Sequence, residues 1–275
     1  MRVAARARFR FARSPLTIVG FAVLTLILFV ALFGPFFAPH PPDKPIGAPF
    51  SRSSSDALLG TDFLGRDVLA RILWGGRSVL ALASLATVLT YAGGLTIGLV
   101  AGFKGSWIDG ILMRAVDVLL SIPGLILLLL LVTGLGTGIV PLVFGVALVL
   151  MPSVARIVRT ATLEQAVRGY AEAAIARGEK TVAILWREIL PNLVSPIAAD
   201  AGLRFTYAII LIASVNFLGL GLQPPAADWG VMVSENRLGI SLNPLPVLVP
   251  AALIGLLAIS LNLLADRYAQ TRERS

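Results

Sequence analysis

The stretch VLALASLATVLTYAGGLTIGLVAGF, residues 79–103, decides the fold, because it runs for this whole length without a charged side chain. A helix needs about 20 apolar residues to cross the ~30 Å hydrocarbon core of a bilayer. We therefore expect residues 79–103 to form a transmembrane helix. Of the 275 residues, 57% are hydrophobic and 14% are charged, whereas soluble domains have about 25% charged residues. This composition excludes a disordered chain, a nucleic-acid-binding module and an ordinary soluble enzyme.

Five further apolar stretches have a similar length. They are residues 16–37, 116–133, 139–155, 193–220 and 245–265. The first is longer than the apolar region of a signal peptide, which favours a retained helix. The sequence therefore predicts an all-α membrane protein with six transmembrane helices. No internal repeat divides it, so we expect one transmembrane domain over residues 16–275, preceded by a basic cytoplasmic segment, residues 1–15.

The basic residues predict the orientation in the membrane. With the N-terminus in the cytoplasm, 16 of the 23 Lys and Arg residues lie on the cytoplasmic side and six lie outside. Such an excess is typical of cytoplasmic loops. We therefore expect both termini in the cytoplasm, a long external loop at residues 39–78 and a long cytoplasmic loop at residues 156–191. The formal net charge of +8 then reflects topology and not nucleic-acid binding.

The sequence lacks the residues that most catalytic and metal sites need. The absence of cysteine excludes disulfides, iron–sulfur clusters and thiolate zinc sites, and a single histidine, His40, disfavours a histidine metal centre or a Ser–His–Asp triad. No GxxxxGK[ST], HExxH or GxSxG motif occurs. We expect no catalytic residue, metal or cofactor on this chain, so the energy source for any active transport must lie on another polypeptide.

The external loop begins with a proline-rich run and continues into GTDFLGRDVLARILWGGRS, residues 60–78. The prolines favour an extended path, and residues 68–74 predict a short amphipathic helix at the membrane interface. His40 lies beside the prolines, where we expect no ligand role for it.

The cytoplasmic loop contains LEQAVRGYAEAAIARGEKTVAILWREILPN, residues 163–192. Residues 163–177 have helical composition, and Gly178 is placed to end that helix in a left-handed conformation. Residues 181–190 predict a second helix, and Pro191 is expected to reset the chain before the fifth span. The result is a helical hairpin below the membrane. From the residues alone, the hairpin either packs under its own helices or offers an alanine-rich face to a partner.

Several ordered motifs resemble one transporter family. The cytoplasmic loop is similar to the EAA loop of permease subunits in binding-protein-dependent ABC importers. The motif consists of Glu172-Ala173-Ala174, then Gly178, then Glu188-Ile189-Leu190-Pro191. Residues 58–80, 113–129 and 217–232 resemble the dipeptide, oligopeptide and nickel branch, so the likeness spans nearly the whole chain. Two departures stand out: Ile175-Ala176-Arg177 replaces a common Arg-Ala-Leu, and Asp200 and Arg204 interrupt a helix that is usually apolar.

The resemblance implies a type I ABC importer permease fold in the bacterial inner membrane, with the loop docking as a coupling helix on an ATPase. The residues it assigns to this contact are Tyr170, Glu172, Ala173, Ala174, Arg177, Gly178 and Pro191. The implied partners are a second homologous permease, two ATP-binding cassette ATPases, an extracytoplasmic solute-binding protein and the lipid bilayer. The implied substrates are peptides, with nickel complexes or glutathione as alternatives.

A second group of residues lies within the predicted spans. Gly94, Gly98 and Gly102 recur at i+4 spacing, which favours tight helix packing over substrate contact. Asp200 and Arg204 are i, i+4 neighbours that either mark a translocation pathway or neutralise each other near the cytoplasmic end. Asn216 fits either a pathway or a helix–helix hydrogen bond.

A second class of function is a secondary transporter or channel that needs no ATPase. Inverted repeats and clusters of ionisable residues at the bilayer midplane would favour it. The sequence shows neither, apart from Asp200 and Arg204. An intramembrane enzyme would require a catalytic constellation, which the sequence lacks.

Overall fold

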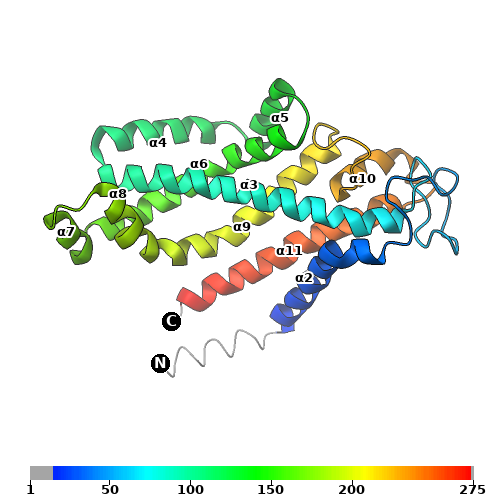
Figure 1. Ribbon diagram of the computed structural model, residues 1–275, viewed down its shortest axis with the longest axis horizontal. Coiled ribbons are helices and arrows are strands. Elements are labelled where there is room, and N and C mark those ends of the chain that lie inside the picture. The colour runs from blue at the N-terminus through cyan, green and yellow to red at the C-terminus, as the bar shows by residue number, and fades with distance from the viewer. Residues whose placement is uncertain (1–14, 274–275) are drawn as a thin grey trace.

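The computed structural model describes residues 15–273, and within this range it contains helices, loops and two isolated β-bridges. The elements run along the chain as drawn in Figure 1. In order they are α2 (Pro15–Phe33), η1 (Gly34–Phe37), α3 (Val68–Lys104), α4 (Ser106–Ser121), α5 (Gly124–Leu135), α6 (Ile139–Ala166), α7 (Gly169–Ala176), α8 (Thr181–Ile184), η2 (Leu185–Ile189), α9 (Leu190–Phe217), α10 (Trp229–Asn236), η3 (Arg237–Gly239) and α11 (Leu245–Glu273).

Five helical segments of the described chain are long and apolar enough to cross a membrane. They are Thr17–Phe37, Val68–Lys104, Ile139–Ala166, Ile197–Phe217 and Leu245–Ala265. The pair α4 and α5 makes a sixth span if the two are counted together, although they are bent by 91°. The predicted all-helical membrane fold is confirmed, but its third span is broken.

The break between α4 and α5 lies inside the stretch 116–133, which was predicted as one helix. Ile122 has an extended backbone (φ −94°, ψ 129°) and Pro123 follows it. A proline disfavours the helical conformation of the residue before it and supplies no N–H to the preceding turn. Hydropathy alone does not predict the bend, because the residues on both sides of it are apolar.

The long helices form an elongated bundle with different structures at its two ends (Figure 1). Helices α7 and α8 lie at one end, which we call the α7 end. The loop 38–67 and α10 lie at the other, the α10 end. Helix α3 runs along α6 between the two ends, and α9 and α11 run beside them.

The close approach of α3 and α6 depends on glycines. A Cβ added at Gly94 would lie 2.6 Å from Val154 Cγ1, and one at Gly98 would lie 2.6 Å from Val158 Cβ. At Gly102 it would lie 2.7 Å from the Arg159 carbonyl oxygen. The three glycines therefore form the face of α3 that touches α6, which agrees with the packing interpretation of their spacing.

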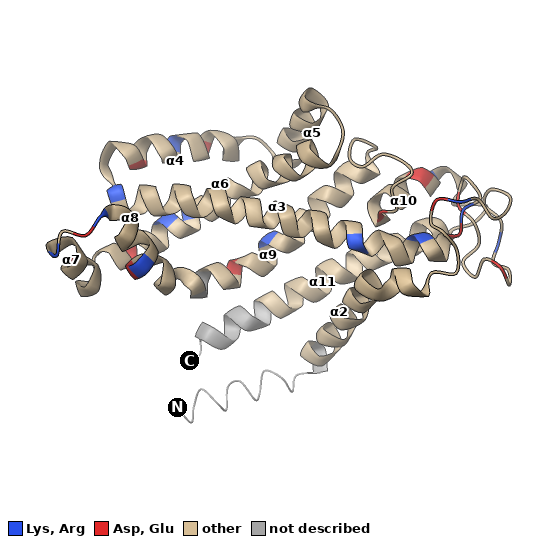
Figure 2. Ribbon diagram, in the orientation of Figure 1, with Lys and Arg blue, Asp and Glu red and all other residues tan. Residues whose placement is uncertain are grey.

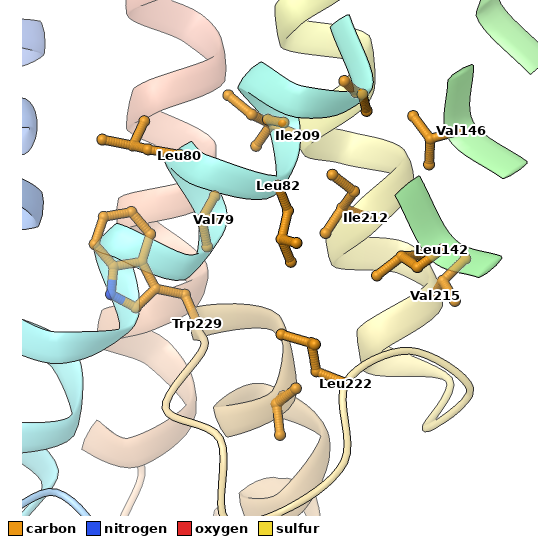
Figure 3. Close-up of a cluster of buried hydrophobic side chains, with 14 of the residues drawn as sticks. Val79, Leu80, Leu82, Leu142, Val146, Ile209, Ile212, Val215, Leu222 and Trp229 are labelled. Atoms are coloured by element: carbon orange, nitrogen blue, oxygen red, sulfur yellow. The ribbon is translucent and has the colours of Figure 1, made fainter. Parts of the chain in front are cut away.

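The main hydrophobic core lies towards the α10 end (Figure 3). Trp229 at the start of α10 is fully buried, and its Nε1 donates a hydrogen bond to the Ile72 carbonyl at 2.9 Å. It packs over Gly75 and Gly76 of α3. The other labelled core side chains come from α3, α6, α9 and the loop before α10: Val79, Leu80, Leu82, Leu142, Val146, Ile209, Ile212, Val215 and Leu222.

Residues 68–74, predicted as a separate interfacial helix, are instead the first turns of α3. Asp67 caps this helix, because its Oδ1 accepts a hydrogen bond from Leu69 N at 3.0 Å. Val68, Ala70 and Arg71 are all buried, so these turns belong to the bundle and not to its surface. The helix extends because the loop and α10 cover it, which the local sequence does not show.

Candidate functional site

The predicted helical hairpin is present, but its first helix starts later than expected. Residues 163–177 were predicted as one helix, whereas α6 continues to Ala166 and α7 begins at Gly169. Arg168 between them is extended (φ −83°, ψ 146°). The break turns α7 so that Ala171 and Ala174 are buried. Alanine-rich composition favours helix over the whole stretch and gives no signal for this turn.

Gly178 ends α7 as predicted. It has φ +74°, and Glu179 N donates to the Ala174 carbonyl at 3.2 Å, the bond that closes a left-handed helix end. A Cβ at this position would meet nothing within 4 Å. The requirement for glycine therefore comes from its backbone conformation and not from crowding.

The second helix of the hairpin continues directly into the fifth span. Helix α8 passes into a π-helical turn, η2, and then into α9. In this turn Leu190 N donates a hydrogen bond to the Leu185 carbonyl. The prediction that Pro191 resets the chain is wrong, since Pro191 lies in the first turn of α9. A proline is tolerated there because its missing N–H has no obligatory partner.

The hairpin is held against the bundle by its own small core. The buried members are Leu99, Val154, Val158, Ala174, Ile184, Leu185, Ile189 and Leu193. They come from α3, α6, α7, α8, η2 and α9. The hairpin is therefore fixed to three long helices at once, and a displacement of α7 would be transmitted to all of them.

The hairpin residues assigned by the resemblance have different surroundings. Glu172 and Ala173 are exposed, and no described residue makes an ion pair with Glu172. Arg177 pairs within the hairpin, with its Nη2 2.7 Å from Glu179 Oε1. The Tyr170 hydroxyl donates to Gln165 Oε1 at 2.6 Å, and burial raises the pKa of this phenol. Glu172 thus remains as an uncompensated charge on the outer surface of α7.

Asp200 and Arg204 form the ion pair that their spacing predicts. Arg204 Nη2 lies 3.0 Å from Asp200 Oδ1. The other carboxylate oxygen, Oδ2, accepts a hydrogen bond from the Tyr91 hydroxyl of α3 at 2.7 Å. Figure 2 shows one acidic and one basic position part-way along α9, away from both ends. Tyr91 was not expected from the sequence, because its contact is 109 residues away.

Asn216 lies near the α10 end of α9 and is buried. Its Nδ2 donates to Asp228 Oδ1 at 2.9 Å, and its Oδ1 accepts from Leu222 N at 2.9 Å. Asp228 in turn caps α10 by accepting from Gly230 N. Burial raises the pKa of the Asp228 carboxyl, while these hydrogen bonds oppose the rise. Asn216 therefore joins α9 to α10; its role in a pathway stays a prediction.

A buried cluster of four charges at the α10 end was missed from the sequence. Asp62 Oδ2 lies 2.7 Å from Arg66 Nε and 2.6 Å from Arg71 Nη1. Glu235 Oε2 lies 3.0 Å from Arg66 Nη2 and 2.7 Å from Arg71 Nη1. The Asp62, Arg66 and Arg71 side chains are at most 2% exposed and that of Glu235 is 8% exposed. Two acids and two bases balance, so the cluster ties the loop, α3 and α10 together without net charge.

The pattern Asp62, Arg66 and Arg71 was a signal for this cluster. Three charges at the start of an apolar span are costly unless they are paired. Their partner Glu235, however, lies 164 residues from Arg71, and local spacing does not indicate it.

No metal site appears in the part of the chain that the structure describes, where no group of three or more His, Asp or Glu side chains is placed to hold an ion. His40 Nδ1 lies 3.0 Å from Asp67 Oδ2. His40 therefore contacts the residue that caps α3.

Residues 94–274 match the family described as the inner membrane component of binding-protein-dependent transport systems. Residues 4–56 match the N-terminal transmembrane domain of oligopeptide transport permease C. The chain belongs to this permease family. The matches cover both the first span and the region that contains the hairpin, so the family resemblance of the motifs is confirmed.

Curated relatives of this permease align over nearly its full length. It is 34% identical over 263 residues to the di/tripeptide transport system permease DppC of Pseudomonas aeruginosa, covering 93% of this chain and 87% of that one. It is 35% identical over 261 residues to the glutathione transport system permease GsiD of Pectobacterium atrosepticum, covering 94% and 86%.

A solved structure of the MetNI methionine ABC transporter in an inward-facing conformation contains a chain with the same fold. The TM-score is 0.57 at 20% sequence identity, and the match covers 76% of this permease and 96% of that chain. The type I importer fold expected from the sequence is therefore confirmed.

Proposed function

We propose that this chain is one of two permease subunits of an ATP-driven importer and forms half of a translocation pathway for peptides or a similar small solute. Both termini and the α7 end lie in the cytoplasm, as the distribution of Lys and Arg indicates. Peptide transport is supported by the names of the relatives, one of which is instead named for glutathione. Nickel complexes are a third substrate class.

The observation that carries the proposal is the α7 hairpin. A transport subunit driven by an external ATPase needs a rigid element that is exposed to the partner and fixed to the membrane helices. Helix α7 exposes Glu172 and Ala173, ends at Gly178 and continues through α8 and η2 into α9. We assign the contact with an ATPase to α7 and the transmission of its movement to α9.

The partners follow from this assignment. The sequence has no phosphate-binding loop, so two ATP-binding cassette subunits supply ATP and Mg²⁺ beneath the two permeases. A solute-binding protein delivers substrate at the α10 end. An ATPase-independent transporter is disfavoured, because it would leave the exposed carboxylate of Glu172 and the rigid hairpin without a role.

Replacing Glu172 by Ala and Gly178 by Ala together is expected to reduce substrate-stimulated ATP hydrolysis of the assembled transporter to its basal rate. The first change removes the unpaired charge, and the second forces a side chain into a left-handed conformation at a cost of about 1–2 kcal/mol. The measurement is ATP hydrolysis in proteoliposomes with and without loaded binding protein. Co-purification of the ATPase reports on docking.

The matched control is Glu164→Ala, which removes an exposed carboxylate from the end of α6 and should leave hydrolysis unchanged. Wild-type stimulation in the double variant would contradict the role of the hairpin. Solute uptake by the chain without any ATPase would overturn the importer proposal itself.

A further inference from the structure

Helix α9 has one polar face along about half of its length. Asp200, Arg204, Tyr207 and Ser214 follow the helical repeat, with apolar Leu211 between the last two. From Asp200 to Ser214 a helix advances about 21 Å, which is two-thirds of a ~30 Å bilayer core. We call these four residues the α9 polar face.

The rest of the molecule covers this face only in part and leaves its middle, at Tyr207, exposed. Tyr207 is 52% exposed and neighbouring Ile210 is 41% exposed, whereas the opposite side of α9 is buried in the core. That buried side comprises Ala208, Ile209, Ile212 and Val215. A guanidinium and a phenol directed at lipid hydrocarbon would be costly, so this face requires water or another polar surface.

The charged pair on this face is neutral as a unit and only partly shielded. The Arg204 side chain is 16% exposed and the Asp200 side chain is 10% exposed. Tyr91 binds one side of the carboxylate, and the guanidinium lies 6.0 Å from the centre of the Tyr207 ring. The Nη1 group of Arg204 donates no hydrogen bond to any described residue. One turn of α9 therefore presents a positive and a negative group side by side.

We propose that Asp200 and Arg204 form a transit subsite for a zwitterionic solute, with Arg204 facing its carboxylate and Asp200 its ammonium group. This inference rests on the importer function proposed above. A zwitterion exchanges ion pairs with the site without leaving a net charge in the membrane, whereas a singly charged solute leaves one partner uncompensated. Because the pair already neutralises itself, binding is weak, as passage through a pathway requires.

The absence of cysteine from the sequence makes a direct test possible. Tyr207→Cys in the assembled transporter is exposed to a cationic and an anionic methanethiosulfonate reagent, and the two rates of modification are measured. We expect Tyr207→Cys to react with both reagents much faster than Leu26→Cys, a 63% exposed position on the apolar helix α2.

The charged pair should control the ratio of the two rates. In the Tyr207→Cys background, Arg204→Gln leaves Asp200 alone and should raise the cationic-to-anionic ratio. Asp200→Asn leaves Arg204 alone and should lower it. Each change should be about threefold or more. Alanyl-alanine should slow modification, and the same dipeptide with an acetylated N-terminus and an amidated C-terminus should not.

Three results would overturn the subsite. In the first, Tyr207→Cys is modified no faster than Leu26→Cys. In the second, the ratio of the two rates is unchanged in both charge variants. In the third, the free and the blocked dipeptide slow modification equally, or neither slows it. The first result would indicate that a second permease covers this face. Labelling needs no ATP turnover, so these results are separate from a failure of the importer proposal, which the hairpin variant and uptake measurements report.

Discussion

Glu235→Gln is expected to lower the free energy of unfolding of the permease by about 3–5 kcal/mol, because it leaves a buried positive charge without its partner. Arg66 and Arg71 both donate to Glu235 Oε2, at 3.0 and 2.7 Å. With the carboxylate removed, Asp62 alone faces two guanidinium groups in a site from which water is largely excluded. The measurement is the unfolding midpoint in mixed micelles, followed by tryptophan fluorescence.

The matched control is Arg237→Gln, two residues further along the chain. Arg237 is exposed and donates to the Phe217 carbonyl and Ser234 Oγ at 3.4 and 3.3 Å. Its loss should change the unfolding free energy by less than about 0.5 kcal/mol. Equal midpoints for the two variants would show that the buried cluster does not stabilise the α10 end.

Features that depend on local spacing were predictable. The spans follow from about 20 consecutive apolar residues. The left-handed end of α7 follows from one glycine after a helix, and the Asp200–Arg204 pair follows from i, i+4 spacing. In each case the interacting groups lie within a few residues of one another, so the sequence contains the whole signal.

Features that depend on distant contacts were not predictable. Glu235 meets Arg66 across 169 residues, and Tyr91 meets Asp200 across 109. The bend at Pro123 was also missed, although its signal was local. Hydropathy is averaged over a window, so one proline among leucines lowers the mean hydropathy only slightly. The same proline changes the backbone of the preceding residue, Ile122, from helical to extended.

Helix α9 joins the two parts of the molecule that the proposed function requires. At the α7 end it continues from η2 and the hairpin, and at the α10 end Asn216 binds Asp228 at the start of α10. Between them, Asp200 is bound by Tyr91 of α3. Movement of the hairpin therefore reaches the polar face and the α10 end through one helix, provided that α3 stays packed along α6.

The packing of α3 on α6 is the second feature whose loss should have a large effect. Gly98→Leu is expected to destabilise the permease by about 3 kcal/mol or more, because overpacking of a close contact forces the backbone apart. An added Cβ would already lie 2.6 Å from Val158 Cβ and 2.7 Å from the Ala155 carbonyl oxygen. The backbone oxygen cannot rotate away as a side chain can, so the two helices must separate.

Gly255→Leu in α11 is the matched control, since a Cβ at Gly255 meets nothing within 4 Å. Both variants add the same apolar side chain to a spanning helix, and only Gly98→Leu should lower the unfolding midpoint. The small core that holds the hairpin includes Val158, so Gly98→Leu should also weaken ATPase stimulation in variants that still assemble. Equal midpoints for the two leucine variants would contradict the assignment of the glycine face to α6 and would favour its contact with a second permease.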